Sequence, residues 1–569
     1  MNLRHSERLP SSLAALILGA ALSAGVQAQG RPAGDPLDQL PVQTPAPGPA
    51  ARPPQLEVQQ PAGAAAAQAD QAIHPSRFDI DGVRAIPFDA VAQLFAPWVG
   101  RPATVEQLTA IANEATALYR AQGYPLSFVY VPAQSFADGV VRVTAVEGFV
   151  AKVRIEGDAG PAEPKLLQIA QGMLGERPLR MATFERVSQL LTRIPGIALT
   201  ADAALPGSTD GATDLVLKVR RQPYNVALSA DLRQPKSRAI LSGVLNDPFV
   251  PGGQLTASTA LGDFQLDRLF TLGYTQLVGG DGLAIKASVV SYSGYPDKQN
   301  GPDSALVRHN DNRRAQLSAS YPLTLSARGG ATVEGGLYAV NNTDSYRVSQ
   351  NGVTLNDETR IRALFAQLSW SDTTATRARV ANLFVAQGLR VAGAAAYQTS
   401  NTPGVAGRSP TDLDFTRVSL DLSQRDRYAG GWGSAVSLGG QYSPNTLATS
   451  ERVSFGGLRF GRGYAPGDGV GDAGWGAGLE LNRQFPVDAG PWLQQLEPYV
   501  LLEGAQVRTE LGTPSPRQLL SAALGVRLSD SRHYSVDLAL AKPMGDAAPT
   551  NPERKLRASV LLVYQFDSL

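Results

Sequence analysis

Residues 455–485 read FGGLRFGRGYAPGDGVGDAGWGAGLELNRQF, and this stretch says most about the architecture. Its first half carries the tripeptide Arg462-Gly463-Tyr464 among glycines, which make it too flexible for a strand. From residue 475 the two faces alternate: one has Trp475, Ala477, Leu479 and Leu481, and the other has Gly476, Gly478, Glu480 and Asn482. Such alternation is typical of a strand between lipid and water. The stretch therefore predicts a cationic loop that joins the wall of a membrane barrel and folds inside it.

Similar alternation continues through the C-terminal part of the chain, where helical periodicity is absent. Sixteen strands can be assigned between residues 223 and 569, most with one continuous apolar face. Three apolar faces illustrate the pattern: Tyr224, Val226, Leu228, Ala230 and Leu232; Tyr534, Val536, Leu538 and Leu540, opposite Ser535 and Asp537; and Leu556, Ala558, Val560, Leu562, Tyr564 and Phe566. The predicted fold class is a membrane β-barrel of 16 antiparallel strands at residues 223–569.

The lengths of the connections distinguish a barrel from a soluble β-sandwich, which would also alternate. Connections after odd-numbered strands include long polar ones near residues 295–312, 343–358, 391–414 and 445–473. Those after even-numbered strands, such as 247–253 and 279–282, are short turns. Long loops at one end and short turns at the other are typical of outer-membrane barrels, and a sandwich has no reason to sort its loops this way.

The N-terminus predicts export from the cytoplasm. Arg4 and Arg8 precede an apolar run at residues 13–26, and the small residue Ala28 follows, which is the layout of a signal peptide at residues 1–28. A membrane anchor is the alternative, but the run is shorter than the ~20 residues that span a bilayer. No later stretch is longer, so a membrane location requires a closed barrel. A signal peptide together with a barrel implies the outer membrane.

Between the signal peptide and the barrel, a linker and two similar modules are expected. Residues 29–76 are rich in proline, alanine and glutamine and predict an extended tether, with a short helical turn possible at 64–72. Residues 77–148 and 149–222 then repeat one order: strand, helix, helix, strand, strand. In the first module, Thr104-Val105-Glu106-Gln107 is a capping box that opens the second helix.

The composition argues against several classes of function. Lys+Arg 51 against Asp+Glu 50 does not suggest a nucleic-acid partner, and the absence of cysteine excludes disulfides and thiolate chemistry. The histidines, His5, His74, His309 and His533, have no carboxylate at ligand spacing, so no metal site is expected. Neither a P-loop nor a Gly-x-Ser-x-Gly motif is present. We therefore expect neither an enzyme nor a cofactor.

These features together resemble the TpsB transporters of two-partner secretion, the family of the filamentous haemagglutinin and haemolysin activation/secretion proteins. The likeness covers a signal peptide, a Pro-rich linker, two POTRA-like modules and a sixteen-strand barrel whose sixth long loop carries Arg-Gly-Tyr. Three further motifs look like the family's: Val146-Glu147-Gly148, Gly471-Asp472-Ala473-Gly474 and Pro498-Tyr499. The chain departs from the family where Gly461 precedes the tripeptide, where Glu503 stands for an aspartate, and where Phe566 is followed by three more residues.

The resemblance implies export of one large, mostly β-helical protein across the outer membrane, with the modules in the periplasm. The implied partners are the N-terminal domain of that exoprotein, outer-membrane lipid and the machinery that inserts barrels. The alternative within the same superfamily is a factor that assembles other outer-membrane proteins. A passive porin or adhesin is a third possibility, for which the two modules would be superfluous.

A barrel of this strand number encloses water, so something must obstruct it. We expect the long loop to fill the bore, with the Arg462 guanidinium tied to Glu503 on the thirteenth strand by a charge-assisted pair of a kind that can be bidentate. The alternative is a solvated surface arginine. A helix formed by residues 29–72 is a second candidate for the plug. The exoprotein could add a strand at an edge of a module, either 127–131 or 197–203, unless the modules are only spacers.

The candidate functional residues are therefore Arg462, Gly463 and Tyr464 in the loop, Glu503 on the wall, Gly471, Asp472, Gly474 and Glu480 at the twelfth strand, and Ser127, Phe128, Val129, Tyr130 and Val131 for client binding.

Overall fold

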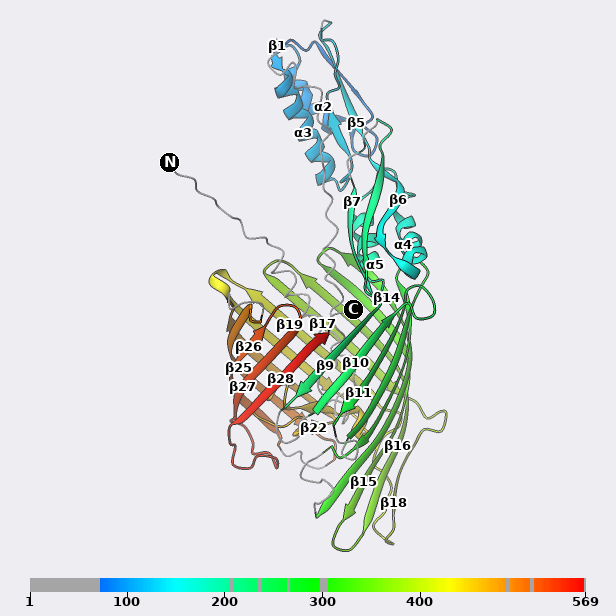
Figure 1. Ribbon diagram of the computed structural model, residues 1–569, viewed down its shortest axis with the longest axis vertical. Coiled ribbons are helices and arrows are strands. Elements are labelled where there is room, and N and C mark those ends of the chain that lie inside the picture. Colours follow the sequence, from blue (N-terminus) through cyan, green and yellow to red (C-terminus); the bar gives the residue numbers. More distant parts are fainter. Residues whose placement is uncertain are drawn as a thin grey trace.

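The computed structural model describes residues 72–136, 138–203, 206, 209–232, 238–262, 267–296, 305–487, 492–511 and 516–566. The predicted signal peptide, nearly all of the linker with its possible plug helix, and residues 567–569 lie outside the described residues. Figure 1 shows two small α+β modules stacked end to end, with the second resting on one end of a barrel. Among the described residues, no helix is both long and apolar enough to cross a membrane.

Module 1 contains β1 (Ala72–Ile73), β2 (Arg77–Asp81), α2 (Phe88–Phe95), η4 (Ala96–Trp98), β3 (Ala103–Thr104), α3 (Val105–Ala121), β4 (Phe128–Tyr130) and β5 (Val140–Val146). The sheet order is β2-β5-β4, and the helices cover one face of the sheet. The predicted capping box is present, because the Thr104 side chain accepts from Gln107 and the Gln107 side chain accepts from Thr104. One boundary differs: β1 pairs with β3 and Ile73 is buried, so the folded module begins inside the predicted linker.

Module 2 repeats this arrangement with β6 (Phe149–Asp158), η5 (Gly160–Ala162), α4 (Glu163–Ala170), η6 (Gln171–Met173), α5 (Met181–Thr192), β7 (Ile197–Ala203) and β8 (Ala212–Arg221). The sheet order is β6-β8-β7, so the last strand is again central and parallel to the first. The apolar face of its second helix, formed by Phe184, Val187, Leu190 and Leu191, is buried in the module core.

The barrel is closed by antiparallel pairing of its last strand with its first. In chain order its strands are β9 (Tyr224–Asp231), β10 (Arg238–Asn246), β11 (Gly253–Leu261), β12 (Asp267–Val278), β13 (Leu283–Gly294), β14 (Leu306–Ser326), β15 (Gly329–Val348), β16 (Thr354–Thr373), β17 (Arg377–Gly388), β18 (Ala395–Ser400), β19 (Thr416–Arg427), β20 (Trp432–Tyr442), β23 (Ala473–Arg483), β24 (Phe485–Pro486), β25 (Gln495–Arg508), β26 (Gln518–Ser529), β27 (Tyr534–Pro543) and β28 (Arg557–Phe566). β17 and β18 share one position beside β16, as β23 and β24 do beside β25. The described residues therefore form the predicted 16 positions.

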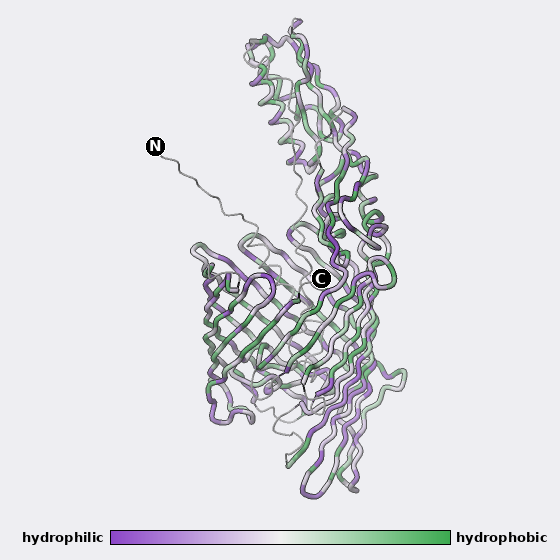
Figure 2. Tube along the Cα trace, in the orientation of Figure 1, coloured by the Kyte–Doolittle hydropathy of each residue, from purple (hydrophilic) through white to green (hydrophobic). Residues whose placement is uncertain are grey.

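The two faces of the wall differ as the sequence predicts. On β23, Trp475 is 59% exposed on the outside, whereas Glu480 is 9% exposed and faces the bore. Figure 2 shows apolar and polar residues alternating along the barrel strands, with largely hydrophilic residues at the far ends of the longest hairpins. An apolar outer band and a polar bore are what a barrel in lipid requires.

Three of the predicted long loops are shorter than expected because their strands continue. β14, β15 and β16 have 21, 20 and 20 residues, well beyond the about 9–11 that cross a bilayer. Much of the predicted loops at 295–312 and 343–358 is thus paired strand, and β18 occupies part of 391–414. Outside lipid both faces of a hairpin can be polar, so alternation fades although the backbone stays paired.

Candidate functional site

The segment between β20 and β23, residues 443–472, lies inside the barrel and is called the long loop below. It contains η9 (Thr449–Glu451) and the paired strands β21 (Val453–Phe455) and β22 (Gly469–Gly471). Its Phe455, Phe460 and Tyr464 are buried against the inward-facing residues Ala505, Val507 and Leu519. The predicted loop at 445–473 is therefore placed in the bore, as the sequence led us to expect.

Arg462 at the tip of the long loop contacts two wall strands, β25 and β27. Its Nη1 donates to both carboxylate oxygens of Asp537, at 3.2 and 3.1 Å, and to the hydroxyl of Tyr499. The Tyr499 hydroxyl in turn donates to Asp537 Oδ1 at 2.7 Å. Only 9% of the Arg462 side chain is exposed, so this arginine is not a solvated surface residue.

The expected side-chain pair between Arg462 and Glu503 is wrong, although the two residues do touch. Oε2 of Glu503 accepts backbone N–H groups of Gly461 and Arg462, at 3.0 and 2.8 Å. Because the carboxylate lies beneath the backbone turn, the guanidinium extends past it to β27. Glu503 therefore binds the backbone of the tip, and Asp537 neutralises the charge of the Arg462 guanidinium.

The other two residues of the tripeptide have separate contacts. A Cβ at Gly463 would lie 2.7 Å from the backbone nitrogen of Pro543, so only glycine allows the loop to approach β27 this closely. Tyr464 is 1% exposed, and its hydroxyl donates to the carbonyl of Asp546 at 3.0 Å. The tripeptide thus combines an ion pair, a close backbone approach and a buried aromatic anchor.

Glycines on the inner face of β23 make space for the aromatic rings of the long loop. A Cβ at Gly476 would lie 2.6 Å from two ring carbons of Phe460, and one at Gly474 would lie 3.0 Å from the Phe455 ring. Phe460 itself has a left-handed backbone, with φ of 49°. A strained conformation in a bulky residue persists only where surrounding contacts hold it, and the slot lined by these glycines provides them.

Gly471 and Asp472 close the base of the long loop. Asp472 is fully buried, and its carboxylate accepts the N–H groups of Leu447 and Glu510, at 2.9 and 2.8 Å, and Nε of Arg452 at 3.2 Å. A Cβ at Gly471 would lie 2.5 Å from the carbonyl oxygen of Arg508. Asp472 therefore joins both ends of the long loop to the segment that follows β25.

Glu480, the last of the predicted twelfth-strand residues, contacts the wall and not the loop. Its two carboxylate oxygens accept hydrogen bonds from Nη1 and Nη2 of Arg527, at 2.7 and 2.6 Å, which makes a bidentate pair. Arg527 also donates to Glu497 at 2.7 Å and lies 3.7 Å from Asp537. Glu480 thus positions the arginine beside the carboxylate that holds Arg462. Sequence reasoning missed Asp537 and Arg527, although the alternation of the fifteenth strand did place Asp537 in the bore.

The client-binding candidates in module 1 are less available than expected. β4 is an edge strand, but the N–H and carbonyl of Val129 already bond the Thr116 hydroxyl of α3, at 2.9 and 3.3 Å. Ser127 is buried and its hydroxyl accepts from Gly148 at the module junction. Phe128 is buried, whereas Tyr130 and Val131 are partly exposed. In module 2, β7 pairs with β8 alone among the described strands.

The junction motif at Glu147 joins the segment that precedes α2 to α3. The Glu147 carboxylate accepts the N–H groups of Arg84 and Ala85, at 2.7 and 2.6 Å, and the hydroxyl of Tyr119 at 3.0 Å. Burial raises the pKa of Tyr119, and the neighbouring Glu147 carboxylate raises it further, so the tyrosine stays a neutral donor.

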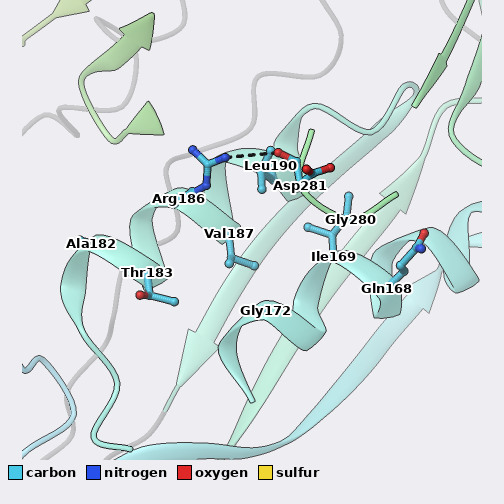
Figure 3. Close-up of a pocket in the computed structure, with 10 residues that line it drawn as sticks. All are labelled: Gln168, Ile169, Gly172, Ala182, Thr183, Arg186, Val187, Leu190, Gly280 and Asp281. Atoms are coloured by element: carbon cyan, nitrogen blue, oxygen red, sulfur yellow. Dashed lines mark hydrogen bonds between the residues drawn. The ribbon is translucent and has the colours of Figure 1, made fainter. Parts of the chain in front are cut away.

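Module 2 is fixed to the short turns of the barrel. Arg186 on α5 donates to the carbonyl of Asp281 at 3.3 Å, and Lys165 on α4 donates to that of Gly279 at 3.1 Å. Burial lowers the pKa of the Lys165 ammonium. Between the helices and the turn a groove of about 590 Å³ opens, with the Arg186–Asp281 bond at its end (Figure 3). Its lining is Gln168, Ile169, Gly172, Ala182, Thr183, Arg186, Val187, Leu190, Gly280 and Asp281.

Comparison with known proteins gives a consistent result. Residues 73–148 match the family model of the ShlB-type POTRA domain, and residues 270–528 match that of the haemolysin secretion/activation proteins ShlB, FhaC and HecB. The heme/hemopexin transporter protein HuxB of Haemophilus influenzae is 21% identical over 480 residues, 80% of each chain. The outer membrane transporter CdiB of Escherichia coli is 28% identical over 174 residues, 28% of this chain and 29% of CdiB.

Solved structures show the same fold. CdiB from Escherichia coli superposes with a TM-score of 0.65 at 18% identity, over 99% of this chain and 100% of CdiB. BamA from Haemophilus ducreyi lacking POTRA domains 1–3 gives 0.54 at 14% identity, over 87% of this chain and 100% of that one.

Proposed function

The chain belongs to the haemolysin secretion/activation family of ShlB, FhaC and HecB, the outer-membrane transporters of two-partner secretion, and from this premise we propose how it exports its partner protein. The partner is a large β-helical exoprotein that reaches modules 1 and 2 unfolded, in the periplasm. It passes through the barrel in extended form once the tip of the long loop has moved, and it folds outside.

The contact of Arg462 with Asp537 and Glu503 is the observation that carries this mechanism. The tip of the loop is held on two wall strands by a small set of contacts around one arginine, so fewer bonds must break to release it than to release a packed plug domain. The bonds are charge-assisted and partly shielded from water, so they are strong enough to keep the resting bore obstructed. No nucleotide motif occurs in the sequence, so folding of the exoprotein outside would provide the direction.

For recognition we propose strand addition at β7. Its core-facing residues Ile197, Leu199 and Ala201 hold it in module 2, and its far edge lies opposite β8. An extended client would bond that edge through its main chain. Because the protein has no cysteine, Thr200→Cys provides a single thiol there. Disulfides with every second residue of a cysteine-scanned client segment are expected, and Glu163→Cys on the exposed side of α4 serves as the control. Crosslinking without a period of two would contradict strand addition.

The proposed function is tested by replacing the gene with Arg462→Ala in the native strain. We expect the exoprotein to disappear from the medium while the barrel still inserts, as shown by heat-modifiable migration in gels. The outer-membrane level of porins should not change. Secretion at the normal level would refute the mechanism, and loss of porins would favour an assembly factor, whose fold is similar.

A further inference from the structure

The long loop has a second buried ionic contact, far along the loop from Arg462. Glu451 in η9 is fully buried, and its Oε2 accepts the hydroxyl of Tyr338 on β15 at 2.8 Å and lies 3.3 Å from Nη2 of Arg417 on β19. Arg417 is 2% exposed and also donates to Gln441 at 3.3 Å. The ring of Phe384, on β17 between them, lies 4.9 Å from the guanidinium carbon.

Apolar contacts and loop-to-loop bonds reinforce this contact. Leu447 and Ala448, just before η9, are buried in a cluster formed by inward-facing residues of β15, β16 and β17. Thr446 exchanges two hydrogen bonds with Asp412 of the preceding loop, at 2.9 and 3.0 Å. The first arm of the long loop, residues 445–451, is therefore attached to the arc of wall from β15 to β19.

Arg462 attaches the tip to a different arc, although the neighbouring Arg459 also contacts Asp421 on β19 at 3.2 Å. The tip is in addition closed on itself. Arg462 reaches β25 and β27, which are separated from β19 by β20 and β23 in the barrel order. Within the tip, the N–H of Gly457 donates to the carbonyl of Tyr464 at 3.0 Å. The two attachments share no side chain, and so each could be broken without breaking the other.

We propose that Glu451 is a second lock of the long loop, a positioning residue that keeps the first arm on β15 and β19 when Arg462 releases the tip. The long loop then opens as a hinged flap and not as a free tether. A buried carboxylate beside a buried arginine fits this role, because removing either one leaves the other uncompensated in a site from which water is excluded. The inference rests on the proposed obstruction of the bore by the loop.

Spin labels can test the two locks separately, since the protein has no cysteine to remove. Thr449→Cys reports the first arm and Pro466→Cys reports the tip. In purified, folded protein, Glu451→Gln is expected to mobilise the label at 449 and leave that at 466 immobile. Arg462→Ala should do the opposite. Tyr338→Phe, which removes only the hydroxyl, gives a milder variant should Glu451→Gln fold poorly. Joint mobilisation of both labels, or no response to either change at Glu451 or Tyr338, would overturn the proposal.

Ion conductance in planar bilayers supplies a second readout that needs no exoprotein. If the two attachments act separately, the double variant should show a fold-change in open probability equal to the product of the fold-changes of Glu451→Gln and Arg462→Ala, to within about twofold. The side chains of Glu451 and Arg417 touch. The fold-change of the Glu451→Gln, Arg417→Met double variant should therefore differ from the product of the single fold-changes by roughly two- to a hundredfold. Glu334→Gln, which breaks the wall pair with Lys286, is the matched control and should not change opening. A double variant that opens no more than Arg462→Ala alone would refute the second lock, while leaving the proposed function intact.

Discussion

Asp537 and Glu503 hold the same loop residue through different atoms. Glu503 receives two backbone N–H groups, and Asp537 receives the guanidinium together with the Tyr499 hydroxyl. Arg527, itself fixed by Glu480, lies 3.7 Å from Asp537 and places a second positive charge beside that carboxylate. The tip is therefore held by an alternating series of charges, and a change at one position alters the next.

Replacing each carboxylate by its neutral amide distinguishes the roles of Asp537 and Glu503. Asp537→Asn leaves Arg462 without its counter-charge, and removing one partner of a buried pair costs about 3–5 kcal/mol. Glu503→Gln keeps an acceptor for the two N–H groups, so its cost should be nearer 1 kcal/mol. We expect Asp537→Asn to raise conductance and abolish export, and Glu503→Gln to have a smaller effect on both.

The matched controls are the two exchanged pairs. Arg462→Asp with Asp537→Arg should recover export in part, whereas Arg462→Glu with Glu503→Arg should not. Recovery by the second pair alone would mean that Glu503, and not Asp537, neutralises the arginine.

The sequence placed Glu503 beside the tripeptide, but the side-chain pair that it predicted is wrong, because the guanidinium pairs with Asp537. Alternation assigns Asp537 to the inner face of its strand without giving its height relative to residues on other strands. That height depends on register, here Arg527 opposite Asp537 and Tyr499 opposite Gly525. Register follows from turn geometry and the tilt of the strands in the closed barrel, which a single sequence does not reveal.

At the scale of elements, β23 and the long loop fit each other through glycine. The outward side of β23 is apolar, as expected, whereas its inward glycines accept the rings of Phe455 and Phe460. The sequence placed Gly476 and Gly478 on the face that turns inward, and missing side chains on one face leave room for something to pack against it. Which residues pack there could not be predicted, because the loop has no periodic pattern from which the positions of its aromatic rings could be read.

Gly476→Ala tests this fit. Its Cβ would lie 2.6 Å from the Phe460 ring, and forced overpacking typically costs about 1–3 kcal/mol. Since Phe460 lies in the tip close to Arg462, a shift of its ring should weaken the contacts of Arg462. We expect more frequent channel opening in bilayers and a fall in export, with normal heat-modifiability.

The control for this change is Gly243→Ala on β10, where an added Cβ meets no atom within 4 Å. That variant should conduct and export as the unmodified protein does. Equal behaviour of the two alanine variants would show that the slot has no part in holding the loop.

At the scale of the whole molecule, the modules and the barrel are joined by contacts that restrict their relative orientation. Leu126 leaves module 1 to pack in the core of module 2, and the N–H of Met181 on α5 donates to the carbonyl of Gly123 at 2.8 Å. Arg186 and Lys165 then connect module 2 to the barrel turns. The number and order of modules were predictable from the repeat. Their docking was not, because it depends on single residues such as Leu126 that follow no period.

Gly148, in the junction motif, is the residue on which this docking depends most closely. A Cβ there would lie 2.2 Å from the carbonyl oxygen of Leu126. The backbone of Gly148 is also held in place, because its N–H donates to the Ser127 hydroxyl and its carbonyl accepts the N–H of Leu179. Gly148→Ala should therefore tilt module 1 away from module 2 while each keeps its own core. Gly175→Ala, where a Cβ meets nothing within 4 Å, is the matched control.

Distances between spin labels at Glu114→Cys and Lys152→Cys, one on the exposed surface of each module, measure the tilt directly. We expect the distribution to shift and broaden in Gly148→Ala only, with export reduced and the barrel still inserted. If the modules deliver an extended chain to the mouth of the bore, their relative orientation must be kept, since a client bound at a misdirected edge would miss the opening. Normal export despite a shifted distance distribution would mean instead that the modules act as independent tethers.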